Sequence, residues 1–198
     1  MLAAVILSGG ASTRMGSPKA LLPYQGRPFL EHLLEVTQHP KIGVRRVVLG
    51  AHAEPIARAV QLNADEIVIN DSWSGGQLSS IHAALHSLPV GTDGMLLCLI
   101  DHPLISAELV GELVERFRKE RKPIVLPVYN GLRGHPVIFS SALYNELLAA
   151  PADTGARAVV WAHQNEVDEV RTNEEGCILN LNDPDAFEKL SRSSPSAL

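Results

Sequence analysis

A glycine-rich segment near the start of the chain, LSGGASTRMGSPK at residues 7–19, combines residue types that could bind phosphate. Its glycines permit a tight turn in which several backbone N–H groups point toward one place, and Arg14 and Lys19 add positive charge. The spacing excludes a Walker P-loop, because Lys19 does not directly follow Gly16, and the pattern G-x-G-x-x-G is absent. The residues alone are compatible with another kind of phosphate-binding loop or with an ordinary glycine-rich turn.

A second candidate for chemistry is Asp101, which directly follows the apolar run at residues 95–100. In open parallel sheets, ligands bind beyond the carboxyl ends of the strands, where a residue in this position would lie. A hard divalent cation prefers carboxylate oxygen, so Asp101 is a candidate metal ligand. An Asp before His-Pro is also typical of a turn. The metal hypothesis requires Asp101 and Lys19 to face a common cleft.

Short apolar, β-branched runs predict the strands that would position these residues. They lie at residues 3–7, 46–49, 66–69, 95–100, 123–128 and 136–139. Helical periodicity predicts helices over 28–36 and 78–88, and a third that begins after Ser106, a residue type favoured at N-caps. Weak periodicity at 129–134 and 150–155 predicts loops. The alternation of strand and helix predicts an α/β fold with a mostly parallel sheet.

The composition is that of a folded globular chain. It has 198 residues, of which 45% are hydrophobic and 20% charged, so disorder or a fibrous repeat is a poor description. A net charge of −5 argues against non-specific binding to nucleic acid. The two cysteines, Cys98 and Cys177, lie far apart and predict neither a disulfide scaffold nor a zinc cluster.

The distribution of apolar residues bears on domains and location. No apolar run approaches the ~20 residues of a membrane-spanning helix, so we expect no membrane association. We expect one domain over residues 1–190 and a flexible tail at 191–198, because the last residues are small and polar. The scarcity of cysteine fits a cytoplasmic protein.

The segment at residues 7–19 closely resembles the opening signature of the molybdopterin nucleotidyltransferases. The resemblance continues through the chain in the order of the molybdenum cofactor cytidylyltransferase branch. The matching segments are GGQLSSIHAAL at 75–85, LIDHPL at 99–104, GHPVIFS at 134–140, TGARAVV at 154–160 and LNLNDPDAF at 179–187. This resemblance implies a three-layer α/β/α, Rossmann-like nucleotidyltransferase fold.

The resemblance also implies roles for individual residues. It assigns catalysis to Arg14, Lys19 and Asp101, and Mg²⁺ binding to Asp101 with Asn182, or less favourably Asn180. The nucleotide-binding residues that it implies are Leu7, Ser8, Gly9, Gly10, Arg14, Lys19, Gln77, Leu78, Ser79 and Ser80. The acceptor-binding residues that it implies are His102, Gly134, His135, Pro136 and Arg157.

Three of these residues also have structural interpretations. Asn182 could cap a final helix that begins at Pro184. A lone His135 before proline more often bonds a backbone group, and Arg157 could form a surface ion pair.

The reaction implied by the resemblance is transfer of a CMP group from CTP to molybdopterin cofactor, with release of pyrophosphate and no protein nucleophile. The segments GGQLSSIHAAL and GHPVIF favour CTP over GTP. Two departures bear on the base: His102 stands where the family usually has Gln, and Asn180 and Asn182 replace the usual Asp-x-Asp of the cytidylyl branch.

Three alternatives remain open from the sequence. They are a GTP-dependent molybdopterin guanylyltransferase, a nucleotidyltransferase acting on a sugar phosphate, and a non-catalytic carrier or chaperone of the molybdenum cofactor. A molybdenum enzyme or its maturation chaperone would be a further partner in any of the molybdopterin-related cases.

Overall fold

The computed structural model describes residues 1–12 and 16–182. Arg14 and the predicted tail at 191–198 therefore lie outside the described residues. Within the described ranges, no helix combines the length and apolar character needed to cross a membrane.

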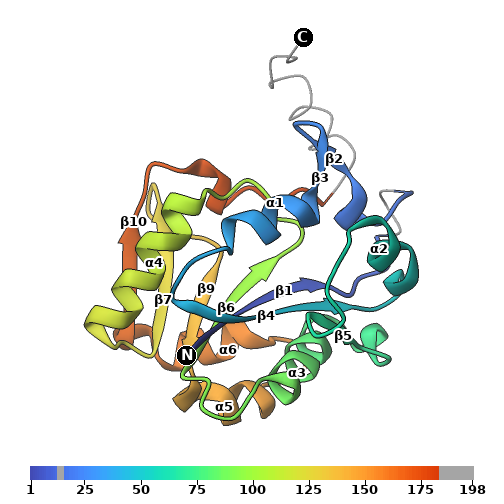
Figure 1. Cartoon of the computed structure of the whole chain (residues 1–198). Helices are drawn as coiled ribbons and strands as arrows, with labels where there is room; N and C mark the ends of the chain where they lie inside the picture. The colour runs from blue at the N-terminus through green and yellow to red at the C-terminus, as the bar shows by residue number, and fades with distance from the viewer. Residues whose placement is uncertain (13–15, 183–198) are drawn as a thin grey trace.

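The strands of the main sheet come from most of the described chain. They are β1 (Leu2–Ser8), β4 (Ile42–Leu49), β5 (Ile67–Ile69), β6 (Gly94–Leu99), β7 (Ile124–Tyr129), β8 (Leu132–Arg133), β9 (Val137–Ser140) and β10 (Val167–Arg171). Their order is β10-β7-β9-β6-β1-β4-β5, with β8 paired to β7 (Figure 1). β4 and β6 run parallel to β1, whereas β9 runs antiparallel to both β6 and β7. The mostly parallel sheet confirms the prediction.

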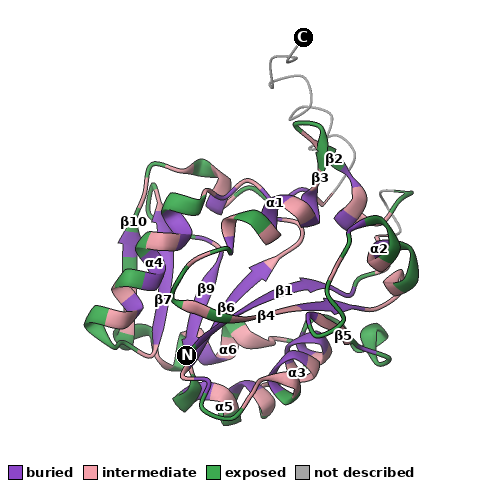
Figure 2. Cartoon of the chain, in the orientation of Figure 1, coloured by how far each residue is buried: buried purple, intermediate pink, exposed green. Residues whose placement is uncertain are grey.

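Helices cover both faces of this sheet (Figure 1). One face carries α1 (Phe29–Val36), α2 (Ala53–Ala59) and α4 (Ala107–Glu120), and the other carries α3 (Gln77–Ser87), α5 (Tyr144–Leu148) and α6 (Ala156–Ala162). Successive side chains of β1 enter opposite cores, Ala4 and Ile6 on one side and Val5 and Leu7 on the other. All of β1 is buried between the layers (Figure 2). The three-layer α/β/α architecture is confirmed.

The predicted helices form where the local signals place them. The N-cap Ser106 accepts a hydrogen bond from the Leu109 backbone N–H at 3.0 Å, which satisfies one of the unpaired donors at the start of α4. The buried stripe of α4 is Leu109, Val110, Leu113, Val114 and Phe117.

Several elements were absent from the sequence prediction, among them α2, α5, α6 and β10. The helices α2, α5 and α6 have only 7, 5 and 7 residues, too few for a clear helical period. β10 buries a single residue, Val170, so it has no apolar run. The stretch 129–134, predicted as a loop, contains the β7–β8 hairpin, since Asn130 and Gly131 have φ values of 49° and 81° that suit a type I′ turn.

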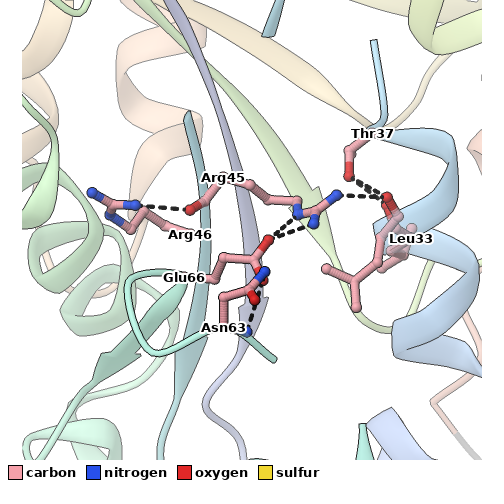
Figure 3. A network of polar contacts seen from close by, with 7 residues as sticks. Leu33, Thr37, Arg45, Arg46, Asn63 and Glu66 are labelled. Carbon is pink, nitrogen blue, oxygen red and sulfur yellow. Dashed lines mark hydrogen bonds and ion pairs between the residues drawn. The ribbon is translucent and has the colours of Figure 1, made fainter. Parts of the chain in front are cut away.

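A partly buried ion pair connects β4 to the turn before β5 (Figure 3). Arg45 donates to Glu66 through Nε at 2.6 Å and to the Leu34 carbonyl of α1 through Nη1 at 3.1 Å. Glu66 also accepts from the backbone and side-chain N–H groups of Asn63 at 3.0 and 2.8 Å. Burial raises the pKa of Glu66, but the hydrogen bonds from Asn63 and Arg45 and the Arg45 charge outweigh it and hold the pKa below its usual value.

Candidate active site

A cavity of about 670 Å³ lies at the carboxyl ends of β1 and β6. These strands are parallel neighbours with Leu7 opposite Leu99, so the loops that follow them open on the same edge of the sheet. Lys19 and Asp101 both line the cavity. The expectation that these two residues face a common cleft is met.

The loop after β1 is held against the end of β4. The Ala51 backbone N–H donates to the Gly9 carbonyl at 3.2 Å, and a ring nitrogen of His52 bonds the Ala11 carbonyl at 2.9 Å. Gly50 permits this approach, because a Cβ at that position would lie 2.3 Å from the Gly9 oxygen. The segment that follows β4 therefore helps to hold the loop after β1 in place.

This packing predicts that Gly50→Ala displaces the loop. The added methyl would meet the Gly9 carbonyl at 2.3 Å and Trp73 Cβ at 2.6 Å, and neither is the end of a flexible side chain. We expect nucleotide affinity, measured by calorimetry, to fall about 100-fold, the cost of a misplacement of roughly 1 Å. Gly111→Ala in α4 is the control, because the nearest atoms to a Cβ there, in the His39 ring, are 3.8 Å away. Equal affinities of the two variants would contradict the prediction.

Lys19 lies between Asp101 and Asn182. Its Nζ is 4.0 Å from Asp101 Oδ2 and donates a hydrogen bond to Asn182 Oδ1. The Leu181 backbone N–H donates to the Asp101 carbonyl at 2.8 Å, which holds Asn182 near Asp101 although the two are far apart in sequence. Two side-chain oxygens thus approach one cationic group within the cavity.

A histidine pair lines the opposite side of the cavity. Because β9 is antiparallel to β6, with Val137 opposite Leu97, the residues before β9 lie at the carboxyl end of β6. His135 therefore packs against His102, with ring centroids 4.9 Å apart. Burial lowers the pKa of both rings, and for His135 burial together with the neighbouring His102 lowers the pKa to about 4, so both rings are neutral at pH 7.

Arg157 of α6 adds a positive charge to the same side of the cavity. Its guanidinium lies 6.0 Å from the centroid of the Trp161 ring, one helical turn further along. The Arg157 charge also contributes to the lowered pKa of His135. A guanidinium in this position can bind the phosphate or carboxylate of a ligand.

Residues 4–167 match the model of the MobA-like NTP transferase domain. The chain belongs to the MobA-like NTP transferase family. It is therefore a nucleotidyltransferase, and the family resemblance inferred from the sequence is confirmed.

Individual members of the MobA-like family show how far the likeness extends. The chain is 34% identical over 165 residues to nicotine blue oxidoreductase of Paenarthrobacter nicotinovorans, covering 77% of this chain and 78% of that protein. It is 26% identical over 198 residues to a molybdenum cofactor guanylyltransferase of Xanthomonas euvesicatoria, covering 96% and 95%.

The fold agrees with a solved structure, Rv0371c from Mycobacterium tuberculosis H37Rv, with a TM-score of 0.85, 25% identity and 97% of each chain covered. A complex of Rv0371c with manganese superposes with a TM-score of 0.81, at 25% identity over 98% of this chain and 99% of that one.

Members of the MobA-like family use a divalent metal, and the donor set of this chain fits one. Asp101 and Asn182 offer two oxygens that already approach the Lys19 ammonium. No group of three or more His, Cys, Asp or Glu side chains suited to a metal occurs within residues 1–12 and 16–182.

The cavity brings together most of the site residues predicted from the sequence. Those that line it are Leu7, Ser8, Gly9, Gly10, Lys19, Gln77, Ser80, Asp101, His102, His135, Arg157, Asn180 and Asn182. Arg14 lies outside the described residues, so its predicted role stays a prediction.

Four predicted residues do not line the cavity: Leu78, Ser79, Gly134 and Pro136. Leu78 is buried in the core, and Ser79 Oγ donates back to a backbone carbonyl of its own segment at 2.8 Å. Gly134 packs on the backbone at Cys177, where a Cβ would lie 2.5 Å from the carbonyl oxygen, and Pro136 is buried. The structure thus does not bring these four residues to the cavity lining, and their predicted contacts with ligands stay a prediction.

Three cavity residues, Ile56, Trp73 and Ile178, lie outside every segment that the sequence analysis singled out. Trp73 lies just before the segment GGQLSSIHAAL, and an aromatic residue beside a predicted base-binding segment was the available signal. Ile178 offered no signal, because its place depends on how the segment after β10 packs over the strand ends.

Proposed function

We propose that this chain transfers a nucleotidyl group from a nucleoside triphosphate to the phosphate of molybdopterin cofactor, with CTP or GTP as the donor. The observation that carries the proposal is the cavity that Gly9, Lys19, Asp101 and Asn182 share. A glycine-rich loop, a cation and two oxygen donors in one cleft are the parts that a triphosphate with its metal requires.

The proposed reaction breaks one phosphoanhydride bond and forms another. An oxygen of the acceptor phosphate attacks the α-phosphorus as the bond from that phosphorus to the β-bridging oxygen breaks, and pyrophosphate leaves with the electron pair. A bound divalent metal would neutralise charge on the phosphate oxygens. Lys19 and the loop N–H groups would hold the triphosphate, and Asp101 and Asn182 would hold the metal. No protein nucleophile is needed, because positioning and charge neutralisation suffice.

The order of the strands suggests which substrate binds on each side of the cavity. The loop after β1 and the start of α3 lie on the β1 side of β6, so we place the nucleotide there. His102, His135 and Arg157 lie on the β9 side, so we place the acceptor there. Asp101 follows β6, so in this arrangement it would stand between the two substrates.

Some features of the chain favour CTP as the nucleotide donor, and others favour GTP. The segments GGQLSSIHAAL and GHPVIF favour CTP. Asn180 and Asn182, together with a relative named molybdenum cofactor guanylyltransferase, favour GTP at least as well.

A nucleotide panel tests reaction and base together. Purified protein is incubated with molybdopterin, Mg²⁺ or Mn²⁺, and each of the four nucleoside triphosphates labelled at the α-phosphate. We expect label to enter the pterin product from CTP or GTP with equimolar pyrophosphate. Label entering only a sugar phosphate supplied in a parallel reaction would replace the molybdopterin proposal. Tight binding of the cofactor without pyrophosphate release would indicate a carrier.

A relative named an oxidoreductase, at 34% identity, makes electron transfer the second activity to examine. It would require a two-electron donor, so a parallel reaction contains NADH or NADPH with an organic dye as acceptor. Donor oxidation in the absence of any nucleotide transfer would favour that activity over the one proposed.

A further inference from the structure

A buried asparagine stands behind the side of the cavity where we place the nucleotide. Asn70 directly follows β5, and only 4% of the residue is exposed. Its backbone N–H donates to the Leu49 carbonyl at the end of β4 at 2.8 Å, which fixes Asn70 to the sheet. A buried amide side chain needs partners for its oxygen and for its two N–H groups, and these partners show what it does.

The hydrogen bonds of the Asn70 side chain distinguish its oxygen from its nitrogen. The Ser72 backbone N–H donates to Oδ1 at 3.0 Å, so the oxygen faces Ser72. Nδ2 therefore faces α3, where it donates to Ser79 Oγ at 2.9 Å and to Ser80 Oγ at 3.0 Å. The amide of Asn70 thus donates one hydrogen bond to each of two neighbouring serine hydroxyls.

The two serines differ in the use of their own protons. A hydroxyl that accepts from an N–H group must direct its single proton elsewhere. Ser79 donates its proton to the Gly76 carbonyl at 2.8 Å. Ser80 is 4% exposed and lines the cavity, and among the described residues it accepts from Asn70 but donates to no group. The proton of Ser80 is therefore left for a ligand.

The loop after β1 lies against the same hydroxyl. A Cβ on Gly9 would be 2.7 Å from Ser80 Oγ, so the glycine leaves room for this oxygen beside the loop. Gly9 and Ser80 both line the cavity. Ser80 Oγ thus lies where α3 meets the glycine-rich loop, two segments that are far apart in sequence.

We propose that Asn70 is a positioning residue that makes Ser80 a hydrogen-bond donor toward the nucleotide. Because Ser80 Oγ accepts from Asn70, its proton faces an acceptor oxygen of the nucleotide, on the base, the ribose or a phosphate. Asn70 itself stays behind the cavity wall and touches no substrate. This inference rests on the nucleotide part of the proposed function and does not depend on the identity of the acceptor substrate.

Asn70→Asp reverses the hydrogen bonds while keeping the shape of the side chain. One carboxylate oxygen still accepts from the Ser72 N–H, and the other now accepts from the serines instead of donating to them. Ser80 then turns its proton away from the nucleotide. The new negative charge also weakens the binding of a triphosphate, so the two effects must be separated.

A double-mutant cycle with Ser80→Ala separates them, because the charge acts in both backgrounds and cancels. Calorimetry measures the affinity for CTP and for GTP with Mg²⁺, without an acceptor substrate. We expect Asn70→Asp to cost about tenfold more affinity when Ser80 is present than in the Ser80→Ala background, the effect of roughly one hydrogen bond. Ser79→Ala is the matched control. Ser79 accepts from the same amide but already donates its proton to Gly76, so its cycle should be additive.

A second cycle tests the same hydroxyl without altering Asn70. In Gly9→Ala the added methyl would meet Ser80 Oγ at 2.7 Å and turn it away from Asn70, whereas Ser80 Cβ is 3.9 Å away. The Ser80→Ala background removes this clash. We expect Gly9→Ala to cost about tenfold more affinity when Ser80 is present. An equal cost in both backgrounds would contradict the inference even if Asn70→Asp does not fold.

The two cycles also separate this inference from the proposed reaction. Equal coupling of Asn70 to Ser79 and Ser80 would mean that Asn70 only supports the fold, and additive effects of Asn70→Asp and Ser80→Ala would likewise overturn the inference. If the unmodified protein binds nucleotide but transfers nothing to molybdopterin, the proposed function fails, and coupling between Asn70 and Ser80 alone still establishes the role of Asn70.

Discussion

Asp101→Asn is expected to lower kcat for nucleotidyl transfer about 10³-fold while nucleotide affinity falls no more than about tenfold. Asparagine keeps the shape of the side chain and removes its charge. The Leu181 hydrogen bond to the Asp101 carbonyl involves only the backbone, so the position of Asn182 is preserved. The charge is needed most when negative charge shifts onto the departing pyrophosphate, so loss of rate exceeds loss of binding.

Single-turnover assays with α-labelled nucleotide, combined with calorimetric titration, measure these two quantities separately. Asp65→Asn is the matched control, because Asp65 is exposed and precedes β5 at the amino-terminal edge of the sheet, away from the cavity. The control should keep both values. A proportional loss of rate and affinity in Asp101→Asn would show that the carboxylate serves binding alone.

Glu66→Ala is expected to lower the free energy of unfolding by about 2–3 kcal/mol. Removing one partner of a buried ion pair leaves the other charge poorly compensated, which costs about 3–5 kcal/mol when burial is complete. Here 22% of the Arg45 side chain is exposed against 9% of Glu66, so the cost should be smaller. Asn63 also loses the acceptor for its backbone and side-chain N–H groups.

Urea denaturation of Glu66→Ala and Glu54→Ala gives the comparison. Glu54 pairs with Arg58 on the surface of α2, where 74% and 78% of the side chains are exposed, so its removal should cost under about 0.5 kcal/mol. Similar losses for the two variants would mean that burial adds nothing to the Arg45–Glu66 pair.

The same carboxylate gives the unfolding free energy a pH dependence of known sign. The pKa of Glu66 is lower in the folded chain than its ordinary value of 4.5, so the unfolded state binds the proton first as the pH falls. The stabilisation is therefore complete above about pH 4.5 and is lost as the pH falls toward the folded pKa. Glu66→Ala should show a shallower decline of stability through this acidic range than the unmodified protein.

The sequence by itself determined those strands, helices and strand-end residues that are specified by residues close together in the chain. The apolar run before Asp101 and the glycines after β1 are local signals, so β1, β6 and the residues at their carboxyl ends could be predicted. Ser106 with its downstream stripe determined α4 in the same way. Because parallel neighbouring strands must end at one edge, these local features already brought Lys19 and Asp101 to the same cleft.

Tertiary structure decided what depends on contacts between distant segments. His135 meets His102 only because β9 enters the sheet antiparallel to β6, and no local pattern specifies that direction. Asn182 reaches Lys19 through a backbone bond between Leu181 and Asp101. Gly50 makes room for the loop after β1 although the two are far apart in sequence. Strand direction and the packing of distant segments are set by the whole core, which short stretches of sequence do not encode.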